Sequence, residues 1–249
     1  MTQRRPGHVA AVIADLVGSR GLQDRAGAQE HVISAWAAAH GQVVKDAGAA
    51  GSTEPRAVSP WATVGDEFQA VYPDLATALR ALLRLQLALE GPVRLRFGIG
   101  LGTVTTLEAG EDGPIQDGDA WWSARAAIEA GHDRDPRGAV IEVRRAGASE
   151  AGAGDGTADG SADAEPAGGV EAAAVRLLEH ALGQLKPRER RIVRGTLEGT
   201  YQSAIAEAEG ISQSAVSQSL SRSGGRMLVE VDALLAGPRT AGETTEDRS

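Results

Sequence analysis

Residues 146–172, AGASEAGAGDGTADGSADAEPAGGVEA, constrain the organisation of this chain more than any other stretch. They are almost entirely glycine, alanine, serine and acidic residues, and Val170 is the one sizeable apolar side chain. Such a stretch buries too little apolar surface to offset its ordering entropy, so we expect a flexible acidic linker. It divides the chain into a larger unit over 1–145 and a smaller one over 173–236. The polar end, 237–249, is expected to be a disordered tail.

The composition indicates the class of protein. The chain has 249 residues and 42% apolar content, which is enough for a buried core. No apolar run reaches the roughly 18 residues of a membrane span, and the N-terminus lacks a signal-peptide pattern. There is no cysteine, which excludes disulfides and thiolate metal sites. We therefore expect a folded, cytoplasmic protein with no membrane partner.

Hydrophobic periodicity in the larger unit alternates between strand and helix. The second helix opens on Asp74, a residue type that caps helix N-termini. In chain order, we expect a strand at 8–17, a helix at 25–48, strands at 57–65 and 67–73, a helix at 74–91, a strand at 93–108, a helix at 119–131 and a strand at 138–145.

The first six of these elements have the order β-α-β-β-α-β, which is typical of the ferredoxin-like arrangement. This is an α+β fold with an antiparallel sheet backed by helices on one face. In that topology the first and third strands are neighbours. Asp15 ends the first strand, and Asp66 lies in the hairpin that begins the third. The sequence therefore predicts that the two carboxylates converge at one edge of the sheet.

Two neighbouring carboxylates repel each other unless a cation neutralises them. Mg²⁺ is commonly held by one or two carboxylates together with phosphate oxygens, so we expect Mg²⁺ or Mn²⁺ with a nucleotide at Asp15 and Asp66. The turn that follows, with Gly18 and Gly21, offers backbone N–H groups to a phosphate. The alternative is that Asp15 is an ordinary turn residue and Gly65–Asp66 an ordinary hairpin turn.

Four blocks carry a resemblance to a known family. VIADLVGS, VGDEFQA, VRLRFGIGLGTVTT and GDAWWSARAA occur in this order between residues 8 and 145, and together they resemble the SatD family. They are more distantly similar to the palm-like domain of class III nucleotidyl cyclases and of GGDEF proteins. The resemblance implies a metal pair at Asp15 and Asp66 and an arginine, Arg125, that faces the triphosphate. It also implies a phosphate loop formed by Leu16, Val17, Gly18 and Ser19.

The chain departs from the cyclase pattern at the groups that orient ribose and base. Cyclases place an asparagine four residues before the triphosphate arginine, where this chain has Trp121, and no asparagine occurs anywhere in it. Val64 replaces the second glycine of GGDEF. These differences favour nucleotide binding over cyclisation, so we assign no catalytic residue.

Some charged residues near these blocks have simpler interpretations. Arg94 and Arg96 share one side of a strand, where we expect a solvated face. His132 and Asp133 follow Gly131, a possible helix C-cap, and are expected in a loop.

The smaller unit contains a helix-turn-helix pattern. TYQSAIAEAEGISQSAVSQSLSR predicts a short helix with Ala204, Ile205 and Ala208 inward, a turn at Gly210, and a second helix capped by Ser212. Val216 and Leu220 are expected to be buried. The pattern resembles the helix-turn-helix of sigma-factor region 4, LuxR-type and MarR-type regulators, with the small Ala204 at the helix crossing.

The second of these helices has side chains of the types that contact DNA bases and phosphates. We expect them to be Gln213, Ser214, Ser217, Gln218, Ser221, Arg222 and Arg226. Residues 185–226 carry seven basic and four acidic side chains, although the whole chain has a net charge of −9. An apolar stripe in 225–237 suggests a homodimer on two half-sites. A helical hairpin used for dimerisation alone is the alternative.

These observations favour a DNA-binding transcriptional regulator whose palm-like domain binds a metal-nucleotide ligand. Two alternatives remain open. One is an enzyme that acts on nucleoside triphosphates and uses the helix-turn-helix for assembly. The other is a scaffold with a vestigial palm.

Overall fold

The structure is a computed structural model that describes residues 8–48, 57–63, 65–89, 91, 93–110, 113–147 and 164–237. The elements up to residue 146 are β1 (Val9–Leu16), the 3-10 turn η1 (Ser19–Gly21), α1 (Arg25–Gly48), β2 (Val58–Ala62), β3 (Glu67–Tyr72), α2 (Leu75–Ala88), β4 (Leu95–Gly102), β5 (Thr105–Gly110), β6 (Gly113–Asp117), α3 (Asp119–Arg134) and β7 (Ile141–Ala146). They are followed by β8 (Ala164–Pro166), α4 (Gly169–Gln184), α5 (Pro187–Leu197), α6 (Gln202–Glu209), α7 (Gln213–Arg222) and α8 (Gly225–Leu235). None of the described helices is long and apolar enough to cross a membrane.

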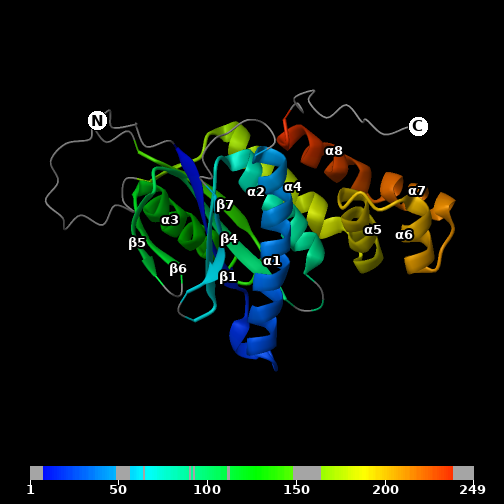
Figure 1. Cartoon of the computed structure of the whole chain (residues 1–249), viewed down its shortest axis with the longest axis horizontal. Coiled ribbons are helices and arrows are strands. Elements are labelled where there is room, and N and C mark those ends of the chain that lie inside the picture. Colours follow the sequence, from blue (N-terminus) through cyan, green and yellow to red (C-terminus); the bar gives the residue numbers. More distant parts are fainter. Residues whose placement is uncertain are drawn as a thin grey trace, which may run out of the picture.

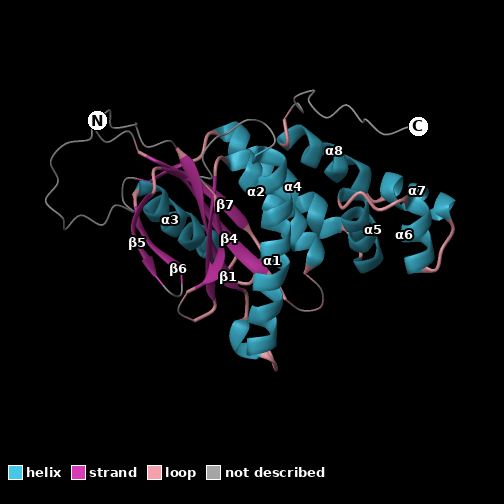
Figure 2. Cartoon of the chain, viewed as in Figure 1, coloured by secondary structure: helices cyan, strands magenta, loops and turns pink. Residues whose placement is uncertain are grey.

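The larger sheet has the strand order β2-β3-β1-β4-β7-β8. Figure 2 shows its strands lying between helices. β1 lies between β3 and β4 and is antiparallel to both. The predicted β-α-β-β-α-β core and the α+β class are confirmed. β7 extends this core by pairing with β4 in parallel, so the sheet is mixed.

Helices cover both faces of the sheet, so the prediction of helices on one face is wrong (Figure 1). Alternate β1 residues explain how. Val12 and Ala14 belong to the large core that contains α1 and α2, whereas Ala11 and Ile13 pack with residues of α3. β1 has no polar face to give to water, because both of its faces are apolar except for Asp15 near its end.

Glycines of β4 allow α3 to lie directly on the sheet. Gly98, Gly100 and Gly102 occupy alternate positions and therefore face the same side. A Cβ atom at Gly100 would collide with the backbone of Ala120 and Ala124. The absence of three side chains thus creates the groove in which α3 packs.

The strand predicted over 93–108 is two strands in the structure. β4 ends at Gly102, and β5 leaves the sheet to form a separate hairpin with β6. The break is held by Asp119 at the start of α3, whose carboxylate accepts a hydrogen bond from the Thr103 hydroxyl at 2.9 Å. This contact crosses 16 residues, which local periodicity does not detect.

The two long helices on the other face follow their sequence patterns. α1 occupies the predicted range 25–48, and Trp36 is fully buried where its indole N–H donates to the Tyr72 hydroxyl at 2.7 Å. α2 begins after Asp74, whose carboxylate accepts from the Thr77 amide at 2.7 Å. The predicted cap at Asp74 is therefore confirmed.

Part of the range predicted as a linker is ordered. Residues 148–163 lie outside the described residues. From Ala164 onward the prediction is wrong, since β8 pairs with β7 and α4 begins at Gly169. Ala164 and Ala167 are buried there, and the Ala167 amide donates to the Val143 carbonyl at 3.1 Å. Backbone pairing compensates for the small side chains, which composition alone does not reveal.

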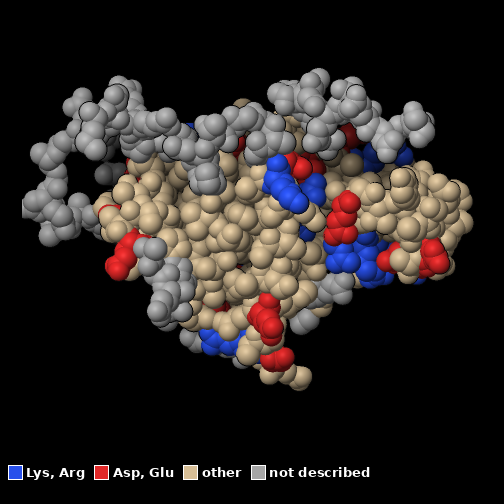
Figure 3. Space-filling view, in the orientation of Figure 1, with Lys and Arg blue, Asp and Glu red and all other residues tan. Residues whose placement is uncertain are grey.

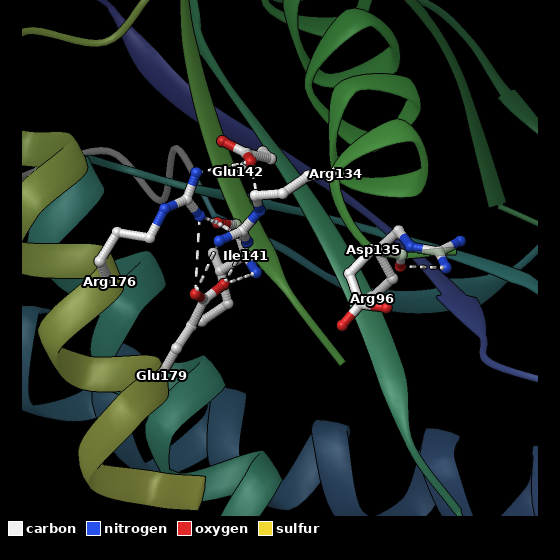
Figure 4. A network of polar contacts seen from close by, with 7 residues as sticks. All are labelled: Arg96, Arg134, Asp135, Ile141, Glu142, Arg176 and Glu179. Atoms are coloured by element: carbon white, nitrogen blue, oxygen red, sulfur yellow. Dashed lines mark hydrogen bonds and ion pairs between the residues drawn. The ribbon is translucent and has the colours of Figure 1, made fainter. Parts of the chain in front are cut away.

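A charged network joins α4 to the edge of the sheet (Figure 4). Arg134, at the end of α3, donates to Glu179 at 2.8 Å and contacts Glu142 at 2.9 Å. Arg176 of α4 donates to Glu142 at 2.7 Å. Glu179 also accepts from the Ile141 amide. These contacts connect the end of α3, the start of β7 and the middle of α4.

A second cluster joins α8 to α2. Asp232 accepts from Arg84 at 2.8 Å and 2.9 Å and from Arg80 at 3.2 Å. Arg80 also donates to Asp46 of α1 at 2.7 Å. The side chains of Arg80, Arg84 and Asp232 are all nearly buried, at 4%, 11% and 7% exposed. The helical C-terminal region is thus packed on the sheet domain through ion pairs that water hardly reaches.

Candidate functional site

The ends of β1 and β3 meet where the sequence predicts. Asp15 lies opposite Glu67 in the antiparallel register, and the Leu16 amide donates to the Asp66 carbonyl at 3.3 Å. Gly65 has φ of 89°, a conformation that glycine adopts readily, and this allows the turn that brings Asp66 to the strand end. The negative charge of Asp66 is close enough to raise the pKa of Asp15.

Arginines neutralise both carboxylates. Asp15 accepts from Arg96 at 3.1 Å, and Asp66 lies 3.5 Å from Arg25, at the start of α1. Arg96 is 3% exposed and also donates to the Pro136 carbonyl at 2.9 Å. The predicted solvated face for Arg96 is therefore wrong. α3 covers this side of β4, so a charged residue there is buried and needs partners.

Burial raises the pKa of the Asp15 carboxyl and outweighs the opposite effect of Arg96. Asp66 and Glu67 raise it further, and a positive charge on His132 lowers it. One carboxylate oxygen, Oδ1, is buried and has no hydrogen-bond partner among the described residues. A buried carboxylate oxygen without a partner is unfavourable unless a cation or donor occupies the adjacent space.

His132 belongs to this cluster and was missed from the sequence. The prediction of a loop at His132 and Asp133 is wrong, because α3 continues past Gly131 to Arg134. The basic residues in this last turn are favourable at a helix C-terminus. Their presence there was a local signal that the helix extends further.

The predicted phosphate loop is reduced to two residues. Leu16 and Val17 are buried, and their amides donate to the carbonyls of Asp66 and Arg94. These two N–H groups are therefore not available to a ligand. Gly18, with φ of 70°, and Ser19 follow at the start of η1.

Arg125, the predicted triphosphate ligand, lies beside the cluster and is paired. It donates two parallel hydrogen bonds to Glu67, at 2.6 Å and 2.9 Å. These hydrogen bonds raise the pKa of Arg125. Its side chain is 45% exposed. An incoming phosphate would therefore compete with Glu67 for this guanidinium.

Among the described residues, no group of three or more histidine, cysteine, aspartate or glutamate side chains is arranged to hold a metal ion. Asp15 and Asp66 still fit Mg²⁺ or Mn²⁺, because such ions often use two carboxylates and take their remaining ligands from phosphate and water. The partnerless Oδ1 of Asp15 is the observation that supports this fit.

Comparison with family models assigns the region that contains this site. Residues 9–146 match the model of the SatD family. The chain belongs to the SatD family. The match includes Asp15, Asp66 and Arg125, whereas the helices from α4 onward lie beyond it. The SatD region therefore covers β1 to β7, and β8 of the same sheet lies beyond it. The search of curated proteins gave no match.

Solved structures similar to this SatD chain include nucleotide cyclases. A bacterial light-regulated adenylyl cyclase has a TM-score of 0.37 and 14% identity, over 57% of this chain and 77% of that one. The guanylate cyclase domain of RhGC from Catenaria anguillulae, in complex with GTP, has a TM-score of 0.38 and 16% identity, over 55% and 78%. Adenylate cyclases from Trypanosoma brucei in their monomeric state have a TM-score of 0.34 and 15% identity, over 57% and 75%.

The predicted helix-turn-helix has the expected backbone. Gly210 ends α6 with φ of 65°, and the Ser212 hydroxyl accepts from the Ala215 amide at 3.2 Å to cap α7. Val216 and Leu220 are buried as predicted. These features confirm the local geometry of two short helices joined by a tight turn.

Two residues of the motif are placed differently. Ala204 is exposed, so its predicted place at the helix crossing is wrong, and Ala208 is exposed as well. Ile205 and Ala206 are the buried residues of α6. α6 therefore turns a different face inward from the one predicted. Its sequence allows this because alanine occurs on several sides of the helix, and any of these small residues fits a close helix contact.

The predicted DNA-contacting side chains are accessible. Ser217 is half-buried, and the other six are exposed. The exposed residues are Gln213, Ser214, Gln218, Ser221, Arg222 and Arg226. Figure 3 shows basic side chains gathered over α5, next to the mostly uncharged surface of α6 and α7. The region thus presents a polar helix beside positive charge.

We predict that Glu209 stabilises this helical region in a pH-dependent way. It accepts two hydrogen bonds from Arg191, at 2.7 Å and 2.8 Å, and these lower the pKa of Glu209. A lowered pKa stabilises the fold above the ordinary value of 4.5 and loses this effect as pH falls through the folded value.

The Glu209→Gln variant should therefore unfold at lower urea concentration than the parent at pH 7, with the difference disappearing at acid pH once Glu209 is protonated in the folded protein. Glu207→Gln, an exposed position on the same helix, is the matched control and should show little change at either pH. A Glu209→Gln effect of equal size at both pH values would contradict the assignment.

Proposed function

We propose that the SatD domain binds a nucleotide together with Mg²⁺ or Mn²⁺ at the β1–β3 edge. The observation that supports it best is the convergence of Asp15 and Asp66, with one buried Asp15 oxygen lacking a partner. A divalent cation would take carboxylate oxygens of Asp15 and Asp66 as ligands and phosphate oxygens as further ligands. We therefore expect the metal ion and the nucleotide each to bind more tightly when the other is present.

Specific residues of the chain would position the nucleotide. Gly18 and Ser19 offer backbone N–H groups at the turn after β1. Arg125 can exchange its two hydrogen bonds with Glu67 for a bidentate contact to phosphate. Arg96 keeps Asp15 oriented through one oxygen and leaves the other for the cation.

The cation, when bound, would screen phosphate charge.

Trp121 stands where cyclases have the ribose-orienting asparagine, and its indole nitrogen is buried without a hydrogen-bond partner among the described residues. It packs against Trp61, with ring centroids 6.0 Å apart. Nothing at this position can accept from a ribose hydroxyl, so binding is proposed and cyclisation is not.

The test measures thermal stability and product formation with Mg²⁺ or Mn²⁺ and each nucleoside triphosphate. We expect a rise in melting temperature only when metal and nucleotide are both present. Asp66→Asn should abolish the rise, and Asp74→Asn, at the α2 cap, is a control that should retain it, because asparagine also accepts the Thr77 amide hydrogen bond. Turnover lost in Asp66→Asn would instead establish the alternative, an enzyme acting on nucleoside triphosphates. No response to any nucleotide would support a scaffold.

We propose DNA binding through α7 as a second function. It is supported by the capped helix, its exposed serine and glutamine side chains, and the basic surface of α5. Met227 and Leu234 of α8 are 59% and 79% exposed, which favours a homodimer with α8 at its interface. Leu228, in the predicted pairing stripe, is buried within the chain and is not part of such an interface.

Replacing Gln218 and Arg222 with alanine should weaken DNA binding about tenfold or more, because both a base-edge and a phosphate contact are removed. The measurement is fluorescence anisotropy with a labelled duplex pool over a series of salt concentrations. Ala204→Ser, at an exposed position of α6, is the control. If the double variant binds as the parent does, α7 is not the DNA-reading helix.

A further inference from the structure

A cavity of about 380 Å³ lies where the C-terminal helices meet the sheet domain. It is bordered by the end of α2, the start of β4 and the turn between α4 and α5, which Figure 1 places side by side. It is separate from the Asp15 cluster. Its volume is in the range of small-molecule sites.

One part of its wall is apolar. Leu87, Leu95 and Leu185 are 1%, 2% and 6% exposed, and Leu89 and Val93 complete this surface at intermediate exposure. An apolar body of a ligand would displace water from the partly exposed side chains of this wall, Leu89 and Val93, which is favourable.

The other part is positively charged. Arg94, Arg190 and Arg191 line the cavity, and none of the described lining residues is acidic. Arg191 is engaged by Glu209. Arg94 is exposed, and its side chain makes no hydrogen bond or ion pair with another described residue.

The Arg190 guanidinium donates its hydrogen bonds to backbone carbonyls and to no carboxylate among the described residues. It donates to the carbonyls of Gln86 and Leu182, each at 2.9 Å, and more weakly to that of Leu185 at 3.4 Å. A guanidinium has five N–H donors, so two remain after these three bonds. Burial lowers the pKa of Arg190, as expected for a cation removed from water with no anion beside it.

We propose that this cavity binds a small organic oxyanion, with its carboxylate or phosphate group on Arg94 and Arg190 and its apolar body on the leucine wall. Planar guanidinium groups bind both kinds of oxyanion through paired N–H donors. The Arg94 carbonyl accepts from the Val17 amide, just before the turn at Gly18, so one backbone hydrogen bond links the cavity wall to the proposed nucleotide site.

The test is titration calorimetry of the full chain, without divalent cations, using four probes. Phenyl phosphate and benzoate carry an oxyanion on an apolar ring, inorganic phosphate carries the oxyanion alone, and phenol carries the ring alone. We expect one of the first two to bind at least about tenfold more tightly than inorganic phosphate, and phenol not to bind. The tighter of the two identifies the ligand as a phosphate ester or a carboxylate.

Arg94→Gln should weaken that binding by about tenfold or more, because it removes charge-assisted hydrogen bonds without touching the fold. Arg137→Gln, at an exposed arginine outside the lining, should leave it unchanged. Asp66→Asn should also leave it unchanged, which separates this cavity from the proposed nucleotide site. The proposal is overturned if neither organic anion binds at about 10 mM, if inorganic phosphate binds equally well, or if Arg94→Gln binds as the parent does.

Discussion

Gly100→Ala is expected to destabilise the sheet domain by about 3 kcal/mol, at the upper end of the usual cost of overpacking. The added Cβ would collide with the backbone of Ala120 and Ala124 in α3, and backbone cannot move aside as a side-chain tip can. α3 would have to rise from β4, which would expose Ala11 and Ile13 of β1 beneath it. Urea unfolding followed by circular dichroism measures the loss.

Gly41→Ala makes the same substitution where the added atom meets nothing within 4 Å. Gly41 lies on the exposed side of α1, so this variant should be about 0.5–1 kcal/mol more stable than the parent. Opposite signs for the two substitutions are the expected pattern. Equal small effects would mean that α3 does not lie against β4 in solution.

Asp232→Ala is expected to cost about 3 kcal/mol, because it leaves Arg84 and part of Arg80 buried without their anion. Arg80 retains Asp46, so the penalty should be toward the low end of that for a broken buried pair. The expected structural consequence is partial undocking of α8 from α2. Hydrogen exchange should therefore rise in α8 before it rises in β1.

Glu230→Ala, two residues earlier on the exposed face of α8, is the control and should change stability by less than about 0.5 kcal/mol. If Asp232→Ala unfolds at the same urea concentration as this control, the ion cluster does not hold the two regions together. The pairing of β8 with β7 and the ion pairs of α4 would then be what holds the helical unit on the sheet.

The sequence was sufficient for features that rest on local patterns and on topology. Hydrophobic periodicity predicted α1, the capping residues Asp74 and Ser212 predicted two helix starts, and the strand order placed Asp15 near Asp66. Each depends on periodicity or on a short-range hydrogen bond, which a single chain displays directly.

Features that rest on distant contacts were not predicted. Arg96 lies on an alternating strand that appears half-exposed, but α3 covers that side because Gly98, Gly100 and Gly102 leave room for it. The alternate glycines were the available signal, since a strand glycine often marks close approach of another backbone. The pairing of Arg125 with Glu67 spans 58 residues and has no local signature.

The order of the region after residue 163 was missed for a related reason. Its alanines carry little hydrophobic signal, and β8 is only three residues long. Its stability comes from backbone pairing with β7 and from the ion pairs of Glu179, neither of which composition reports. Composition alone therefore placed the end of the linker at residue 172, although β8 already begins at Ala164.

The most direct test of the central proposal measures Mn²⁺ binding by electron paramagnetic resonance, with and without a nucleoside triphosphate. With two carboxylates and phosphate as joint ligands, Mn²⁺ should bind weakly to the protein alone and at least about tenfold more tightly with the matching nucleotide. Asp15→Asn and Asp66→Asn should each abolish this gain. The metal-nucleotide site would be contradicted if the nucleotide binds without metal. It would also be contradicted if the nucleotide raises Mn²⁺ affinity as much in both variants as in the parent.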